Sequence, residues 1–299
     1  MTEKNSFTLD FIGIGAEKSG TTWIAECLNN HPEAYVPAEK ELYFFNEYDP
    51  HYLKVKNFRY DRGLEWYKKQ FAPNNAGDKI GEITPTYLYC EKAAERIKKN
   101  FPNIKIIAVL REPTARAFSQ YIHDKRIGLI KNISFEDAIG LHDNYVEKGY
   151  YFKYLSVYYR VFPRENILVL LHDDIKTDPK KTIQRVYQFL RLKNINHVPE
   201  QLFKKSNASA KSRIPILNYF MIHTEYFLKN KKLFPVLRLL EITGARRLAL
   251  RLRDLNSTPL TEYPTIRADT KKYLKNIYKD DITKLKKLLN RDLKEWENA

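Results

Sequence analysis

Residues 13–22 read Gly-Ile-Gly-Ala-Glu-Lys-Ser-Gly-Thr-Thr, a sequence typical of a loop between a strand and a helix in an α/β protein. It begins within the short apolar run Phe11–Ile14 and leads into a segment whose apolar residues recur at helical spacing: Trp23, Ile24, Cys27 and Leu28. Backbone N–H groups of a loop between a strand and a helix, together with the N-terminus of that helix, can hold a phosphate group. The stretch therefore predicts a phosphate-binding loop between the first strand and the first helix.

Further apolar runs are each followed by a segment with helical spacing, which is typical of parallel strands joined by crossover helices. These runs are Lys79–Ile83, Ile104–Leu110 and Ile167–Leu171, and the helices are expected at Cys90–Asn100, from Pro113 onward and at Pro179–Leu190. The unbroken apolar character of Ile104–Leu110 fits a strand buried on both faces, so we expect it at the centre of the sheet. The pattern predicts a three-layer α/β fold of the P-loop type, with a central parallel sheet flanked by helices.

The strand pattern ends at about residue 205, and the rest of the chain reads as helical. Ile214–Leu255 has the pattern of basic amphipathic helices, and Ile266–Trp296 that of one long charged helix with an apolar stripe. We therefore expect a single domain over residues 1–299, with a core at 7–205 and a helical part at 206–299.

The formal net charge of +16 on 299 residues indicates an anionic partner, substrate or surface. Charge alone leaves nucleic acid, acidic lipid and polyanionic glycan open. The only cysteines are Cys27 and Cys90, so no disulfide framework is expected, and no apolar run has the length of a signal peptide core or a membrane span. We expect a soluble cytoplasmic protein, and its charge is compatible with peripheral contact at the inner membrane surface.

The loop departs from the nucleoside triphosphatase pattern G-x-x-x-x-G-K-[ST]. Gly15 and Gly20 have the right spacing, but Thr21 occupies the lysine position and the lysine comes earlier, at Lys18. The most strand-like run ends in Arg111, where phosphoryl-transfer enzymes usually place an acidic residue that helps to hold Mg²⁺. A cation there attracts an anion and repels a metal, so we expect a nucleotide with an additional phosphate that binds without a metal.

These motifs resemble those of the sulfotransferases that use 3′-phosphoadenosine 5′-phosphosulfate (PAPS) and release adenosine 3′,5′-bisphosphate (PAP). Residues 16–23 are similar to the family's loop for the 5′-phosphosulfate, and residues 109–119 to its 3′-phosphate motif, in which Arg111 and Ser119 grip the phosphate. The similarity is greatest to the bacterial and glycan-modifying branch. The donor-binding residues that the resemblance implies are Lys18, Ser19, Gly20, Thr21, Thr22, Trp23, Arg111, Ser119, Tyr151, Lys211 and Arg213.

The resemblance also implies catalytic residues. Lys18 would stabilise the charge on the departing phosphate, and Glu41, in a Lys-Glu-x-x-Phe-Phe segment, would remove the acceptor's proton, with Lys40 holding its carboxylate ionised. His123 lies four residues after Ser119 on the same helical face and is the second candidate base. Each also has a structural interpretation: a solvated loop lysine for Lys18, an exposed Lys-Glu pair that caps an aromatic core segment for Glu41, and a satisfied structural histidine for His123.

The function expected is transfer of a sulfonyl group from PAPS to a hydroxyl or amine of an acidic or lipid-linked saccharide, without nucleic acid as a partner. Ile83 stands where several 3-O-sulfating members have lysine, so that acceptor position is not implied. A nucleotide kinase is the first alternative, and a non-catalytic basic protein that binds membranes or nucleic acid on the same fold is the second. The arginines of the basic helical part are expected to present the acceptor: Arg246, Arg247, Arg251 and Arg253.

Overall fold

The computed structural model describes residues 7–37, 41–49, 56–73, 78–130, 133–203, 210–212, 257–259 and 265–298, with a few isolated positions between 224 and 248. Its centre is a five-stranded sheet with the order β2-β3-β1-β4-β5, in which every neighbouring pair is parallel. The strands are β1 (Phe11–Gly15), β2 (Ala34–Tyr35), β3 (Lys79–Ile83), β4 (Lys105–Leu110) and β5 (Ile167–Leu171). The predicted α/β class is confirmed.

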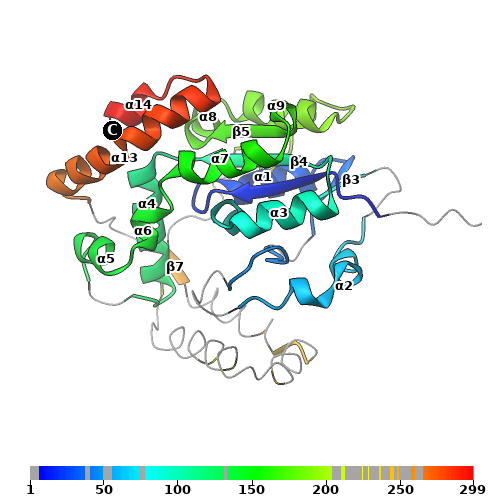
Figure 1. Ribbon diagram of the computed structural model, residues 1–299, viewed down its shortest axis with the longest axis horizontal. Coiled ribbons are helices and arrows are strands. Elements are labelled where there is room, and N and C mark those ends of the chain that lie inside the picture. The colour runs from blue at the N-terminus through cyan, green and yellow to red at the C-terminus, as the bar shows by residue number, and fades with distance from the viewer. Residues whose placement is uncertain are drawn as a thin grey trace, which may run out of the picture.

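Alternation along the strands divides the core into two layers of side chains. On β4, Ile106, Ala108 and Leu110 pack on one face of the sheet, and Ile107 and Val109 on the other. The first face is covered by α3 (Glu91–Asn100), α7 (Tyr151–Val161) and α13 (Ala268–Leu289), and the second by α1 (Thr21–Asn29) and α9 (Pro179–Leu190). Figure 1 shows α3 and α7 lying across the near side of the sheet.

Most of the elements that the sequence predicted begin and end within one or two residues of their observed bounds. The prediction that Ile104–Leu110 is the central strand is wrong in detail: β1 is in the middle and β4 lies between β1 and β5. Both strands are paired on two sides, and β1 has a less apolar appearance only because it contains glycines. Helix α4 (Pro113–Arg126) begins at Pro113, as expected, and the Glu112 side chain caps it by accepting from the N–H groups of Thr114 and Ala115 at 2.8 and 2.6 Å.

The remaining described elements are short. They are α2 (Leu64–Lys68), α5 (Phe135–Leu141), α6 (Asn144–Glu147), α8 (His172–Thr177) and α14 (Lys294–Asn298), the 3-10 turns η1 (Tyr60–Arg62), η2 (Pro85–Tyr89) and η3 (Arg164–Asn166), and the antiparallel pair β6 (Ala210–Ser212) and β7 (Ser257–Pro259). Among the described residues, no helix is both long enough and apolar enough to cross a bilayer.

The expected single helix over 266–296 is wrong, because α13 ends at Leu289 and α14 begins at Lys294. The break is at Asn290, whose left-handed backbone with φ of 49° closes the end of α13, as asparagine often does. Helix α13 is fixed to α7 by Asp281, whose carboxylate accepts from the backbone N–H groups of Phe152 and Lys153 at 2.9 and 3.2 Å.

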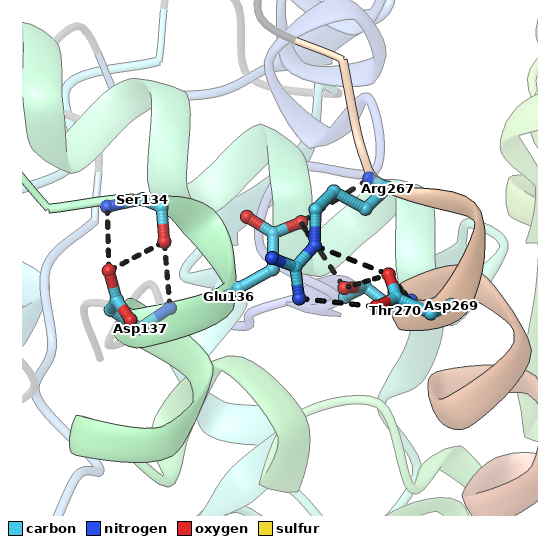
Figure 2. Close-up of polar contacts among 6 residues, drawn as sticks. All are labelled: Ser134, Glu136, Asp137, Arg267, Asp269 and Thr270. Carbon is cyan, nitrogen blue, oxygen red and sulfur yellow. Dashed lines mark hydrogen bonds and ion pairs between the residues drawn. The ribbon is translucent and has the colours of Figure 1, made fainter.

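A second contact fixes the beginning of α13 to α5 (Figure 2). The Oε1 atom of Glu136 accepts from the hydroxyl of Thr270 at 3.2 Å and from the backbone N–H of Arg267 at 3.3 Å. Glu136 itself is in the first turn of α5, which Ser134 and Asp137 close by a reciprocal capping box. Helix α13 is therefore attached to the rest of the chain at α7 and at α5. The division of the domain at residue 205 stays a prediction, but the expectation of helices alone beyond it is wrong, because β6 and β7 lie there.

Candidate functional site

The carboxyl ends of three adjacent strands bring the candidate site together. Strand β1 leads into the loop 16–20, β4 into Arg111, and β5 into His172 at the beginning of α8. Ligands of open parallel sheets bind at this edge, because the loops and helix N-termini that follow the strands converge there. The predicted phosphate loop and the predicted 3′-phosphate residue therefore belong to one site.

The loop has the backbone that a close approach to phosphate requires. Gly20 caps α1 with a left-handed φ of 100°, and Lys18 has a φ of 62°, a conformation that non-glycine residues seldom adopt. At Gly15 a Cβ atom would lie 2.7 Å from the carbonyl oxygen of Pro85, so a larger residue does not fit. The loop thus leads directly into the N-terminus of α1, where the first N–H groups have no partner within the helix.

Arg111 is held against this loop. Its Nη1 atom donates to the carbonyl oxygen of Lys18 at 3.2 Å, and its own carbonyl oxygen accepts from the hydroxyl of Tyr151 at 2.8 Å. Burial lowers the pKa of Arg111, and its Nε atom is buried without a hydrogen-bond partner among the described residues. A guanidinium with an unpaired buried donor fits an anionic ligand, because a ligand oxygen would satisfy that donor.

Lys18 is the second cation of the site. Its pKa is lowered to about 8, mainly by burial and then by the charge of Arg126, whereas the carboxylates of Glu17, Asp124 and Glu41 act in the opposite direction. Lys18 therefore lies within electrostatic reach of Glu41, the predicted base. The resemblance predicts these two residues in one site, and in the structure the charge of Glu41 acts on Lys18.

Glu41 has a strained backbone and a defined partner. Its carboxylate accepts from the hydroxyl of Tyr43, and both residues have left-handed backbones with φ of 62° and 50°. Five non-glycine residues with positive φ are described; Arg191 and Asn290 cap helices, and the other three are Lys18, Glu41 and Tyr43. Strain of this kind concentrates at functional sites. Lys40, expected beside Glu41, lies outside the described residues.

His123 is oriented by Arg126. Its Nδ1 atom lies 3.0 Å from Nη2 of Arg126, and since a guanidinium only donates, Nδ1 must accept. The proton of the neutral imidazole is then on Nε2, which makes that nitrogen a donor. In this arrangement His123 is suited to donating a hydrogen bond rather than to removing a proton.

The other predicted donor-binding residues have different positions in the structure. Tyr151 is buried beside Arg111, Ser119 is half-buried on α4, and Ser19 and Thr21 are buried in the loop and the first turn of α1. Trp23 has a packing role, because its indole N–H donates to the carbonyl oxygen of Leu202 at 3.2 Å and its ring lies in the core on the α1 side. The backbone of Lys211 lies in β6; Arg213 and the expected acceptor-presenting arginines, Arg246, Arg247, Arg251 and Arg253, lie outside the described residues.

Three residues near the site were missed from the sequence: Asp124, Arg126 and His172. Asp124 is buried on α4, where its carboxylate accepts from Gln120 and from the hydroxyl of Tyr145, both at 2.7 Å, and burial raises its pKa. Arg126 comes seven residues after Ser119, a spacing that places both on the same helical face and that could have indicated it. His172 follows an apolar strand, and no motif marks it.

Metal ligands do not gather in the part of the chain that the structure describes. No group of three or more His, Cys, Asp or Glu side chains lies close enough together there to hold an ion.

Comparison with known proteins gives relatives that are named as sulfotransferases. Human heparan sulfate glucosamine 3-O-sulfotransferase 5 is 31% identical over 190 residues, which are 60% of this chain and 52% of the relative. A membrane-associated sulfotransferase of Dictyostelium discoideum is 36% identical over 115 residues, which are 38% of this chain and 22% of the relative. The chain spans about half the length of the heparan sulfate relatives that it matches.

The expectation of a cytoplasmic protein is wrong. It rested on the small number of cysteines and on the lack of an apolar run, yet one relative is a membrane-associated sulfotransferase and others are heparan sulfate enzymes, so cytoplasmic residence is not supported. The physical reason is that two thiols neither require a reducing compartment nor forbid an oxidising one, because a core of this size needs no disulfide.

A solved structure shows the same fold, and the sequence shows the family. A solved sulfotransferase from Alicyclobacillus acidocaldarius superposes with a TM-score of 0.69 over 97% of this chain and 99% of that chain, and at 20% identity it supports the fold alone. The family described as the sulfotransferase domain matches residues 9–235. The chain belongs to the sulfotransferase domain family.

Proposed function

We propose that this protein transfers a sulfonyl group from PAPS to a hydroxyl or amine of a saccharide. The observation that carries the proposal is the hydrogen bond between Arg111 and the carbonyl oxygen of Lys18, which unites two predicted phosphate-binding motifs 93 residues apart. A nucleotide with phosphates at both ends of its ribose needs two cationic subsites of this kind. The kinase alternative is less favourable, because Thr21 occupies the position of its lysine and Arg111 that of its metal-binding acid.

In the proposed reaction the acceptor oxygen or nitrogen forms a bond to sulfur, and the bond between sulfur and the bridging phosphate oxygen breaks. The phosphate leaves as part of PAP and carries the negative charge that develops during the transfer. The ammonium of Lys18 and the N–H groups at the N-terminus of α1 would stabilise that charge. Most of the catalytic effect would come from this stabilisation and from alignment of the two reactants.

The proton of the acceptor would go to Glu41. A carboxylate serves as a base when it lies within reach of the acceptor and is ionised. The Tyr43 hydroxyl donates to the carboxylate and would orient it. His123 is the less favourable base, because its Nδ1 atom is occupied by Arg126.

The donor would be held by Lys18, by the backbone of Ser19 to Thr22 and, at the 3′-phosphate, by Arg111 and Ser119, without a metal. Tyr151 would act through its hydrogen bond to the carbonyl oxygen of Arg111. Lys211 and Arg213 would also bind the donor, a role that rests on the family resemblance alone.

For the acceptor we propose an acidic or lipid-linked saccharide. The net charge of +16 favours an anionic substrate, and the relatives are named for the glucosamine of heparan sulfate. The 3-O position of the relatives is not carried over to this chain, because Ile83 stands where several 3-O-sulfating members have lysine. Ile83 is buried, and a Cβ atom added to Gly13 would lie 2.7 Å from its side chain.

Two measurements test the proposal. Isothermal titration calorimetry should show that PAP binds without a metal and far more tightly than ATP with Mg²⁺. With ³⁵S-labelled PAPS, label should then pass to N-sulfated heparosan oligosaccharides but not to neutral dextran oligosaccharides of the same length. Tighter binding of ATP with Mg²⁺ would overturn the donor, and transfer to dextran alone would overturn the acceptor class.

A further inference from the structure

His172 lies at the site without a role in the reaction described above. It is the first residue of α8, directly after β5, at the same edge of the sheet as the phosphate loop. A Cβ atom added to Gly20 would lie 3.4 Å from Cδ2 of His172 and 3.1 Å from Cδ1 of Ile175. The imidazole therefore packs directly beside the residue that caps α1.

The Nδ1 atom of His172 is buried and has no hydrogen-bond partner among the described residues. The Nε atom of Arg111 is also buried without a hydrogen-bond partner among the described residues, and the positive charge of Arg111 lowers the pKa of the imidazole. An unpaired buried polar atom costs free energy, so buried polar groups are normally satisfied. Two such atoms from neighbouring strands, at the ligand-binding edge of a parallel sheet, indicate a group with several acceptor oxygens.

The charges around His172 favour an anion at this place. Burial is the largest cause that lowers its pKa to about 4, followed by the charges of Arg111 and Lys176, against which the carboxylate of Asp173 acts. The imidazole is thus neutral at pH 7 and carries one proton, which it can place on Nδ1 as a donor.

From this geometry we propose that His172 donates a hydrogen bond from Nδ1 to the phosphate that Arg111 binds, and so helps to select nucleotides that carry a 3′-phosphate. The inference rests on the proposed function, in which that phosphate is the 3′-phosphate of PAPS and PAP. His172 is then a specificity-determining residue of the donor site, from a strand that carries none of the family motifs named above.

The test compares PAP with 5′-AMP by calorimetry for the full chain and its variants. His172→Ala should weaken binding of PAP by about 10- to 100-fold, the usual effect of losing a hydrogen bond to a charged group, and change that of 5′-AMP by less than about twofold. His172→Asn keeps a donor near the position of Nδ1 and should retain most of the affinity, whereas His172→Gln, with its amide nearer to Nε2, should not. The exposed His142→Ala is the matched control and should bind both nucleotides like the unchanged protein.

The outcomes separate this inference from the proposed function. If the unchanged protein does not prefer PAP to 5′-AMP, the donor assignment itself fails. If it does, and His172→Ala keeps the preference, the role of His172 is overturned. Equal losses for both nucleotides would likewise overturn it, because they would show that the ring only packs against the loop at Gly20. Should His172→Ala fail to fold, the contrast between the Asn and Gln variants decides.

Discussion

The carbonyl oxygen of Lys18 accepts a hydrogen bond from Nη1 of Arg111 at 3.2 Å. The two residues belong to different motifs, and each supplies a cation, so the bond fixes the spacing between the two phosphate subsites that we propose. The unpaired Nε atom of Arg111 remains available to the ligand. A change at Arg111 should therefore affect the nucleotide's second phosphate more than its first.

Arg111→Ala should weaken binding of PAP by at least tenfold, because a charge-assisted contact to phosphate contributes about 1.5–3 kcal/mol. Binding of 5′-AMP should change much less. Calorimetry with both nucleotides measures the difference, and Arg160→Ala, an exposed arginine on α7, is the matched control. An equal loss for the two nucleotides would show that Arg111 supports the loop rather than the 3′-phosphate.

Glu41→Gln should leave the affinity for PAP nearly unchanged and lower turnover by about two to four powers of ten, the usual contribution of a general base. The amide keeps the size of the side chain and can still accept from Tyr43, but it cannot take a proton. Transfer of ³⁵S from PAPS measures turnover. The companion His123→Ala should have a smaller effect; a larger one would move the role of base to His123.

The sequence predicted the elements that carry the phosphate loop and Arg111 better than the surroundings of these residues. Residues of the phosphate loop and Arg111 are contiguous with strands whose bounds follow from apolar runs, and β3 and β5 match their predicted ranges. Asp124, Arg126 and His172 carry no motif, because their relation to Lys18 and Arg111 arises only when α4 and α8 pack beside the loop. The break at Asn290 was missed because the apolar stripe continues across it.

Binding of PAP should take up protons at pH 8 to 9. The pKa of Lys18 is about 8 in the ligand-free protein, so part of the population is neutral in this range, and a bound anion raises the pKa and draws a proton onto the amine. Calorimetry in buffers that differ in ionisation enthalpy counts the protons. At pH 6 the lysine is already charged, so uptake by this group should vanish.

Lys18→Arg is the control for that measurement, since a guanidinium stays protonated throughout the range. It should still bind PAP but take up fewer protons at pH 8.5. If uptake is the same in this variant, another group titrates on binding and the low pKa of Lys18 does not govern the effect.

Asp281 attaches α13 to α7. Asp281 is buried and accepts from two backbone N–H groups in the first turn of α7, where a negative charge also interacts favourably with the helix N-terminus. Asp281→Ala removes both bonds and should lower the free energy of unfolding by about 1–3 kcal/mol. The neighbouring Asp280 is exposed, so Asp280→Ala should change stability by less than about 0.5 kcal/mol. Chemical denaturation measures both values, and hydrogen exchange should show faster exchange at the N-terminus of α7 in the Asp281 variant only. Equal stabilities of the two variants would mean that α13 is held by its apolar face, with Leu274, Tyr278 and Leu285, and that the two hydrogen bonds are replaced by water at no net cost.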